Sequence, residues 1–174
     1  MIAYLRENST GEQTPITTIL NYFRVGDELH FKFICENSKL FSAYSGYNEP
    51  LYKGDVCELF ICTGEDIREY YEIEVAPNGA VFFAKIFNEN GLQTTFLEQS
   101  FTASVEITEL GYNVEIVIPC DAICEKEGVP IRFNAFRIET DGGVPERHLL
   151  ALSPTLKPNF HVPERFILFE DLSA

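Results

Sequence analysis

Two oppositely charged residues interrupt segments that are otherwise apolar, and they are the clearest chemical signal in the sequence. Glu58 lies in residues 55–63, where both sides of the expected strand are apolar, and Arg137 interrupts residues 131–139 in the same way. A buried charge is costly unless it is paired or hydrogen-bonded. The two residues therefore either form a structural ion pair or face a ligand. A guanidinium and a carboxylate together suit the vicinal hydroxyls of a polyhydroxyl compound.

Aromatic residues near these charges would supply the apolar part of such a site. Exposed Tyr rings stack on the apolar face of a sugar. Phe160 and His161 belong to a Pro-containing stretch, residues 157–163, that is typical of a surface loop. All of these rings are equally compatible with packing at the edge of a core. Three tyrosines cluster just before the Glu58 segment: Tyr44, Tyr47 and Tyr52.

The remaining polar residues do not form a recognisable catalytic set. Motifs of serine hydrolases, zinc proteases, P-loop proteins and dinucleotide-binding proteins are missing from the sequence. Glu72 and Glu74 alternate along one strand face, which indicates a solvated face rather than an acid and base across a cleft. We therefore expect no catalytic residue, no assigned metal ligand and no cofactor. Glu65 and Asp66 in an acidic connection leave a structural calcium ion open.

Composition limits the classes of partner. The 174 residues are enough for one domain, 1–174, and a hydrophobic content of 45% indicates a folded core. A net charge of −14 argues against binding to nucleic acid or to an anionic membrane surface, and no apolar run is long enough to span a bilayer. Residues 1–17 lack the pattern of a signal peptide, so a cytoplasmic location is expected, or an extracellular one if the chain is a processed domain. The five cysteines lack CxxC spacing and are expected to be reduced core residues.

Strand patterns dominate the chain. About ten short extended segments with almost no helical periodicity predict an all-β fold, an antiparallel β-sandwich of jelly-roll or immunoglobulin-like type. Residues 7–15 are expected to form a loop, and residues 121–127 at most a short helix. The expected strands cover residues 29–35, 40–47, 55–63, 71–76, 80–87, 101–107, 112–118, 131–139, 147–152 and 166–169.

The clearest local prediction is a hairpin around Pro77-Asn78-Gly79. Proline presets φ, and Asn and Gly tolerate the positive φ that the reversal needs. A three-residue turn would pair Ala76 with Ala80 and would place Tyr71 opposite Lys85. Lys85 is then a candidate for the rim of the site.

The order of several motifs resembles the family 9 carbohydrate-binding modules. The likeness runs from about residue 27 to residue 169, and each motif alone is loose, whereas the set in order is specific. Family members are β-sandwiches that bind sugars, some at chain ends between two tryptophans; several are attached to glycoside hydrolases and some carry calcium. The matching segments are residues 52–60, 71–80, 133–139, 150–155 and 160–166.

This resemblance implies non-catalytic binding of a mono- or oligosaccharide. Glu58 matches a family carboxylate that bonds sugar hydroxyls, and Asn134 with Arg137 matches an Asn-x-x-Arg pattern. Tyr52 and Leu152 stand where the family often has Trp, which leaves Phe160 as the candidate for the second ring. The alternative is an interaction or scaffold domain that kept the sandwich, lost the sugar site and holds Glu58 against Arg137. The full set of expected ligand-binding residues is Tyr52, Glu58, Lys85, Asn134, Arg137, Phe160 and His161.

Overall fold

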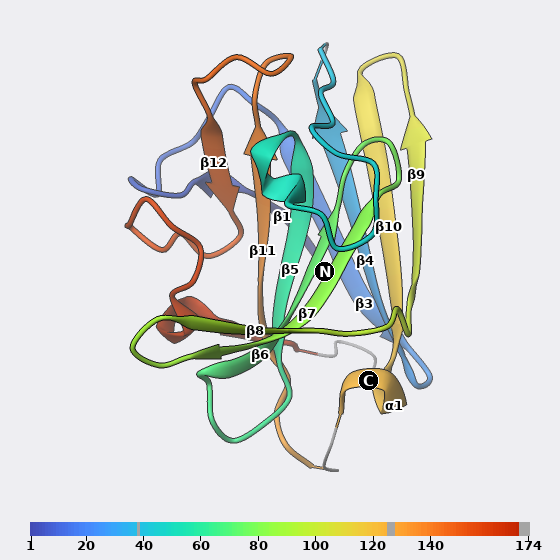
Figure 1. Cartoon of the computed structure of the whole chain (residues 1–174), viewed down its shortest axis with the longest axis vertical. Helices are drawn as coiled ribbons and strands as arrows, with labels where there is room; N and C mark the ends of the chain where they lie inside the picture. Colours follow the sequence, from blue (N-terminus) through green and yellow to red (C-terminus); the bar gives the residue numbers. More distant parts are fainter. Residues whose placement is uncertain (38, 125–127, 171–174) are drawn as a thin grey trace.

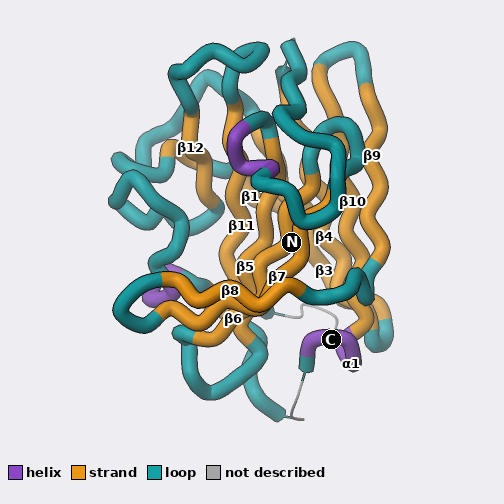
Figure 2. The backbone as a smooth tube through the Cα atoms, viewed as in Figure 1, coloured by secondary structure: helices purple, strands orange, loops and turns teal. Residues whose placement is uncertain are grey.

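The computed structural model describes residues 1–37, 39–124 and 128–170 as two packed antiparallel β-sheets (Figure 1). The predicted all-β sandwich is confirmed. The helical segments of the described residues are short turns, as Figure 2 shows, and none is long and apolar enough to cross a bilayer. These turns are η1 (Leu51–Lys53), α1 (Cys120–Ile123) and η2 (Pro163–Arg165).

The two sheets differ in size. The smaller sheet has the order β1-β3-β4-β10-β9, and the larger has the order β2-β12-β11-β5-β6-β7-β8, with β13 pairing beside β11. The strands of the smaller sheet are β1 (Ile2–Tyr4), β3 (Thr18–Val25), β4 (Glu28–Glu36), β10 (Gly111–Pro119) and β9 (Thr102–Ile107). Those of the larger sheet are β2 (Arg6–Glu7), β12 (His148–Ala151), β11 (Arg132–Glu139), β5 (Val56–Cys62), β6 (Glu69–Val75), β7 (Val81–Asn88), β8 (Leu92–Phe96) and β13 (Ile167–Leu168).

The main core fills the space between the sheets. Alternating residues of β4, among them Phe31 and Phe33, point into it and are fully buried. Leu59 and Ile61 of β5 meet them from the larger sheet. This alternation is what a strand with one buried face requires.

A second apolar layer covers the outer face of the larger sheet. Every residue of β5 is buried, as predicted for a central strand with apolar residues on both sides. Phe60 and Phe136 on this outer face pack against Phe160 and Phe166 from the segment after β12. The sheet is therefore enclosed at this end, and side chains that project from its outer face enter a sheltered space rather than open solvent.

The predicted hairpin between β6 and β7 is confirmed in its register. The Ala76 N–H donates to the Ala80 carbonyl at 3.0 Å, and Tyr71 is the direct partner of Lys85. Gly79 has φ of +85°, a conformation that favours glycine over residues with a Cβ. The register matters for function because it fixes which side chains of β6 and β7 share the outer face.

Expectations about individual strands were wrong at residues 40–47 and incomplete elsewhere, since β1, β2, β3 and β8 were not predicted. Residues 40–47 form no strand; instead the Asp55 carboxylate accepts from the Phe41 N–H at 2.8 Å and holds this segment as a loop. The antiparallel partners of β4 are β3 and β10. The segment of β8 was not predicted because all five of its residues are exposed, and a strand without a buried face has no alternating pattern.

Candidate functional site

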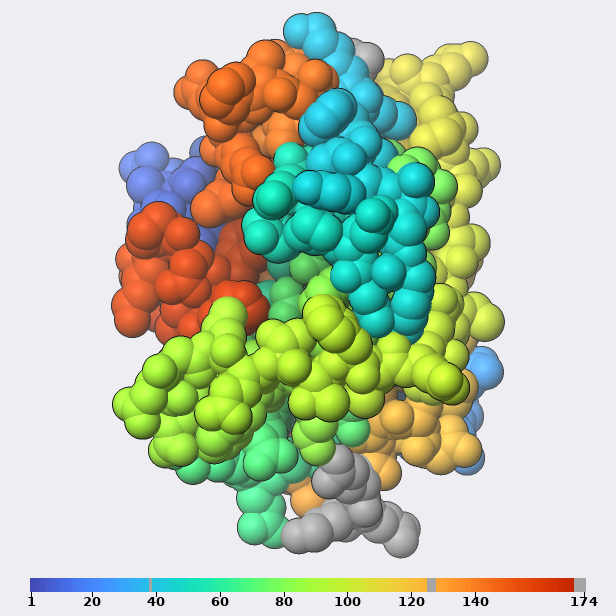
Figure 3. All heavy atoms as spheres, in the orientation of Figure 1, coloured from blue at the N-terminus to red at the C-terminus, as the bar shows by residue number. Residues whose placement is uncertain are grey.

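An open pocket lies over the outer face of the larger sheet. Its volume is about 580 Å³, within the range of small-molecule sites. In Figure 3 it is the hollow where the teal, red and yellow-green segments meet. Strands β5 and β6 form its floor, the η1 segment and β8 form two walls, and the loop after β12 forms a third. Four of the predicted site residues line it: Tyr52, Glu58, Phe160 and His161.

The floor carries three carboxylates rather than one. Glu58 of β5 is the direct cross-strand partner of Glu74 of β6, and Glu72 is the next residue of β6 on the same face. One oxygen from each carboxylate lies within 4.8 Å of the others. The expectation that Glu72 and Glu74 form a solvated face is wrong: Glu74 is only 2% exposed, because the outer face of β6 lies beneath η1 and β8.

Burial and mutual repulsion favour the protonated forms of these carboxyls. Burial, reinforced by the Glu72 charge, raises the pKa of Glu58 well above its ordinary value. Burial, reinforced by Glu58 and Glu72, raises the pKa of Glu74 to about 11. Burial raises the pKa of Glu72 to about 7, although a hydrogen bond with Glu74 opposes the rise. These directions are those expected for like charges in an apolar layer.

Exposed aromatic rings stand over this floor. Tyr52 on η1 is 46% exposed, and Phe96 on β8 is 60% exposed. Phe82, the direct partner of Glu74 in the hairpin, packs edge-on against Phe96 with ring centroids 5.7 Å apart. The pocket therefore offers two accessible apolar faces above polar oxygens.

Arg147 connects one of these rings to the charge of the floor. Its Nη1 donates to the Tyr52 carbonyl at 2.9 Å, which fixes the η1 segment. Its positive charge also acts on Glu58, where it opposes the rise in the pKa of that carboxyl. A single arginine therefore positions the Tyr52 segment and supplies a donor at the rim.

Phe160 and His161 enter the pocket mainly as packed side chains. Phe160 is 7% exposed and stacks on Phe136 at 4.2 Å. His161 stacks on Phe60 at 4.8 Å, and its Nδ1 lies 2.8 Å from the Tyr70 hydroxyl. Burial lowers the pKa of His161 to about 4, so this imidazole is neutral at pH 7.

The structure separates Arg137 from Glu58 and places them on opposite faces of the larger sheet. Arg137 pairs in register with Cys57, so its side chain points into the space between the sheets. There it is fully buried, and its Nη2 bonds Glu139 at 2.5 Å. Its guanidinium also donates to the carbonyls of Thr17 and Glu36. The expected pocket containing both charges is therefore not formed, and neither is the Glu58–Arg137 pair of the scaffold alternative.

Lys85 and Asn134 also lie outside the pocket. Lys85 faces the other side of β7, where its Nζ lies 3.6 Å from a Glu69 carboxylate oxygen. Asn134 is fully buried, and it both donates to the carbonyl of Ser153 and accepts from its N–H. Asn134 thus links β11 to the segment after β12.

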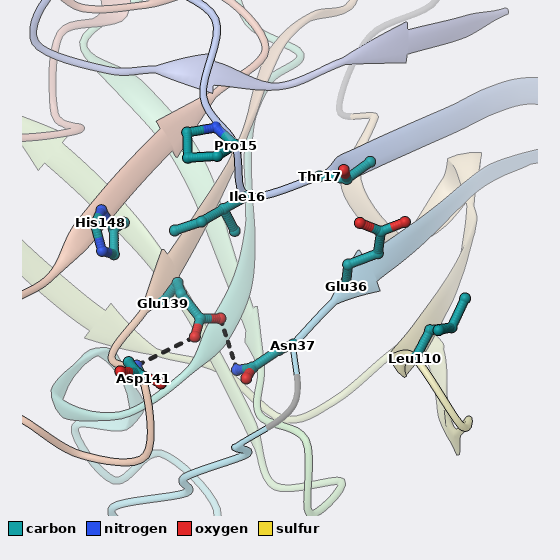
Figure 4. A pocket seen from close by; sticks show the side chains of 9 residues that line it. All are labelled: Pro15, Ile16, Thr17, Glu36, Asn37, Leu110, Glu139, Asp141 and His148. Carbon is teal, nitrogen blue, oxygen red and sulfur yellow. Dashed lines mark hydrogen bonds between the residues drawn. The ribbon is translucent and has the colours of Figure 1, made fainter.

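A second pocket, shown in Figure 4, is a poorer candidate. It has a volume of about 540 Å³ and lies at the end of the sandwich beside Glu139 and Asn37. The Asn37 amide donates to Glu139 and to Asp55, so these three side chains already have protein partners. It contains no Tyr or Phe ring. Its residues complete the hydrogen-bond network around Arg137.

Asp66 in the predicted acidic connection and the two buried cysteines Cys35 and Cys57 contact other groups of the protein. The Arg68 guanidinium donates from Nε to Asp66 Oδ1 and from Nη2 to Asp66 Oδ2, and this bidentate contact lowers the pKa of Asp66 to about 2. Cys35 and Cys57 are buried in the main core with sulfur atoms 3.5 Å apart, too far for a disulfide. All five cysteines are free, as expected.

Comparison with known proteins identifies the fold. No protein-family model and no curated protein sequence matches the chain. Solved structures do match: a candidate carbohydrate-binding protein from Bacteroides uniformis has a TM-score of 0.78 at 18% identity, over 95% of this chain and 84% of its own. A family 9 carbohydrate-binding module from Caldicellulosiruptor kristjanssonii in complex with cellotriose gives 0.68 at 18% identity, over 95% and 79%. A family 9 module from the same organism in complex with glucose gives a TM-score of 0.67 at 16% identity, over 95% of this chain and 82% of its own. This chain has the family 9 module fold.

Within this fold, sequence reasoning missed part of the pocket. The predicted hairpin register makes Phe82 the direct partner of Glu74 and so could have placed both on one face, but neither residue was predicted to line a site. No comparable signal in the sequence pointed to Phe96 or Arg147. Phe96 lies on β8, which was not predicted, and Arg147 lies just before β12. Only the folded sandwich brings them to the same pocket.

Proposed function

We propose that this protein binds a mono- or oligosaccharide, without cleaving it, in the pocket over β5 and β6. The observation that carries the proposal is the combination of two exposed rings, Tyr52 and Phe96, with carboxylate oxygens at the base of one open cavity. A sugar presents an apolar C–H face and a rim of hydroxyls. This pocket is complementary to both.

Each lining group has a distinct role in this proposal. The rings of Tyr52 and Phe96 contact the apolar face of the sugar. Glu58 and Glu74 accept hydrogen bonds from hydroxyls, and Arg147 donates at the rim. The three carboxylates project from one sheet face rather than from two sides of a cleft, which is unsuited to glycosidic cleavage.

The expected affinity is modest. A monosaccharide has about twelve heavy atoms, and about 0.3 kcal/mol for each gives roughly 4 kcal/mol, a dissociation constant near 1 mM. An oligosaccharide that contacts both rings would bind more tightly. Family 9 modules from Caldicellulosiruptor kristjanssonii are described in complex with cellotriose and in complex with glucose, so these two sugars are the first ligands to test.

Calorimetric titration with glucose and cellotriose tests the proposal. Tyr52→Ala and Phe96→Ala each remove one exposed ring and should weaken binding about fivefold, since an aromatic contact contributes about 1 kcal/mol. Tyr4→Ala is the matched control, because Tyr4 is an exposed tyrosine on β1 of the other sheet. A broader glycan array follows if neither sugar gives heat. The proposal fails if no saccharide binds, or if the pocket variants and the Tyr4 variant behave alike.

A further inference from the structure

The three carboxylates at the base of the pocket form an unusual cluster. Two neighbouring strands present them on one face, with Glu58 directly opposite Glu74 and Glu72 two residues before Glu74 on β6. Like charges directly opposite each other destabilise a sheet. All three are buried, which favours their protonated forms in the metal-free protein, and a bound cation would replace these protons.

Two oxygens of this cluster have no hydrogen-bond partner among the described residues. They are Glu58 Oε1 and Glu74 Oε2, both of which are buried. Both residues are 2% exposed and line the pocket. Buried carboxylate oxygens without partners are costly and call for a cation or a donor.

We propose that Glu58, Glu72 and Glu74 bind one hard divalent cation of the calcium class at the base of the pocket. Calcium takes carboxylate oxygens at about 2.3–2.6 Å, so no two oxygens bound to one ion lie more than about 5.2 Å apart. One oxygen from each residue lies within 4.8 Å of the others, so all three can reach a single ion. Magnesium usually keeps several waters and is held by one or two carboxylates, so a cluster of three carboxylates favours calcium.

The bound cation would also act on the ligand. Three carboxylates fill one side of the coordination shell, and the opposite side faces the cavity between Tyr52 and Phe96. Calcium commonly takes six to eight oxygens, so positions remain for water or for two vicinal hydroxyls. This second step rests on the proposed sugar binding, whereas the cation site itself does not.

Metal titration tests the cation site. Tyrosine-sensitised Tb³⁺ luminescence suits a chain with eight Tyr and no Trp, and Ca²⁺ calorimetry at pH 7 gives the stoichiometry. We expect one saturable site, and a rise in Tm of several degrees at a Ca²⁺ concentration 100 times the dissociation constant. Glu74→Gln should weaken Ca²⁺ binding at least tenfold. Glu58→Gln should do the same, so the result does not depend on the folding of one variant.

Glu115→Gln is the matched control, because Glu115 is an exposed glutamate on β10 of the other sheet. It should bind Ca²⁺ as the wild type does. Weak, non-saturating binding that is equal in the wild type, Glu74→Gln and Glu115→Gln would mean adventitious surface binding and would overturn the proposal.

Sugar titrations with Ca²⁺ and with EDTA separate the two proposals. Stronger sugar binding with Ca²⁺ supports hydroxyl coordination by the cation. Equal sugar binding in EDTA overturns that coordination but leaves the proposed function standing. Saturable Ca²⁺ binding without sugar binding under either condition supports the cation site and refutes the proposed function.

Discussion

Replacing Glu74 with Gln should make the protein more stable at neutral pH in the absence of metal. Glu74 is 2% exposed and faces Glu58 and Glu72, with Arg147 as the nearby cation acting on Glu58. The pKa of Glu74 is raised from 4.5 to about 11. Between these values the folded state holds one proton more than the unfolded state, so the free energy of unfolding falls as pH rises.

The size of the effect at pH 7 depends on the pKa of Glu74 in the unfolded state, because its pKa in the folded state lies above 7. Each pH unit above 4.5 lowers the free energy of unfolding by about 1.4 kcal/mol, which gives about 3 kcal/mol at pH 7. Gln at position 74 does not titrate, and its amide still offers a donor to Glu72. The variant should therefore match the wild type near pH 4.5 and exceed it by up to about 3 kcal/mol at pH 7.

Urea denaturation in EDTA at pH 5, 6 and 7, followed by circular dichroism, measures this difference. Glu115→Gln removes a solvent-exposed carboxylate and should show no such pH-dependent gain. A difference between the wild type and Glu74→Gln that stays constant with pH would refute the reasoning. It would mean that Glu74 titrates at an ordinary pKa and that the cluster is hydrated.

Three further substitutions test the framework that holds the pocket. Arg137→Met leaves Glu139 and two backbone carbonyls without their partner, so the free energy of unfolding in urea should fall by about 3–5 kcal/mol, and a loss under 1 kcal/mol would contradict the network. Gly111→Ala would place Cβ 2.0 Å from the Cys35 carbonyl oxygen, so Tm should drop by several degrees, whereas an unchanged Tm would show that the backbone relaxes freely. Asn134→Ala removes both bonds to Ser153 and should cost about 1–3 kcal/mol in the same urea assay; no change would mean that water replaces the amide.

The sequence alone was enough to predict the sandwich and its central elements. The alternation in residues 29–35 and the apolar run around Glu58 correspond to β4 and β5. The turn at Pro77-Asn78-Gly79 predicted the β6–β7 register. These features are local, because side-chain period and turn chemistry act over a few residues. The buried position of Glu58 followed from the same pattern.

The partners of the buried charges were decided by tertiary structure. Glu58 and Arg137 differ by one position in the β5–β11 register, since Glu58 pairs with Phe136 and Arg137 with Cys57. A shift of one residue places side chains on opposite faces of a sheet. Whether Glu58 and Arg137 share a face therefore depends on the pairing of β5 with β11, which the pattern within each strand does not give. Arg137 thereby became part of the core network, and Glu58 instead met Glu72 and Glu74 beneath Tyr52 and Phe96. The pocket exists because strand pairing and loop packing bring together residues that are distant in the chain.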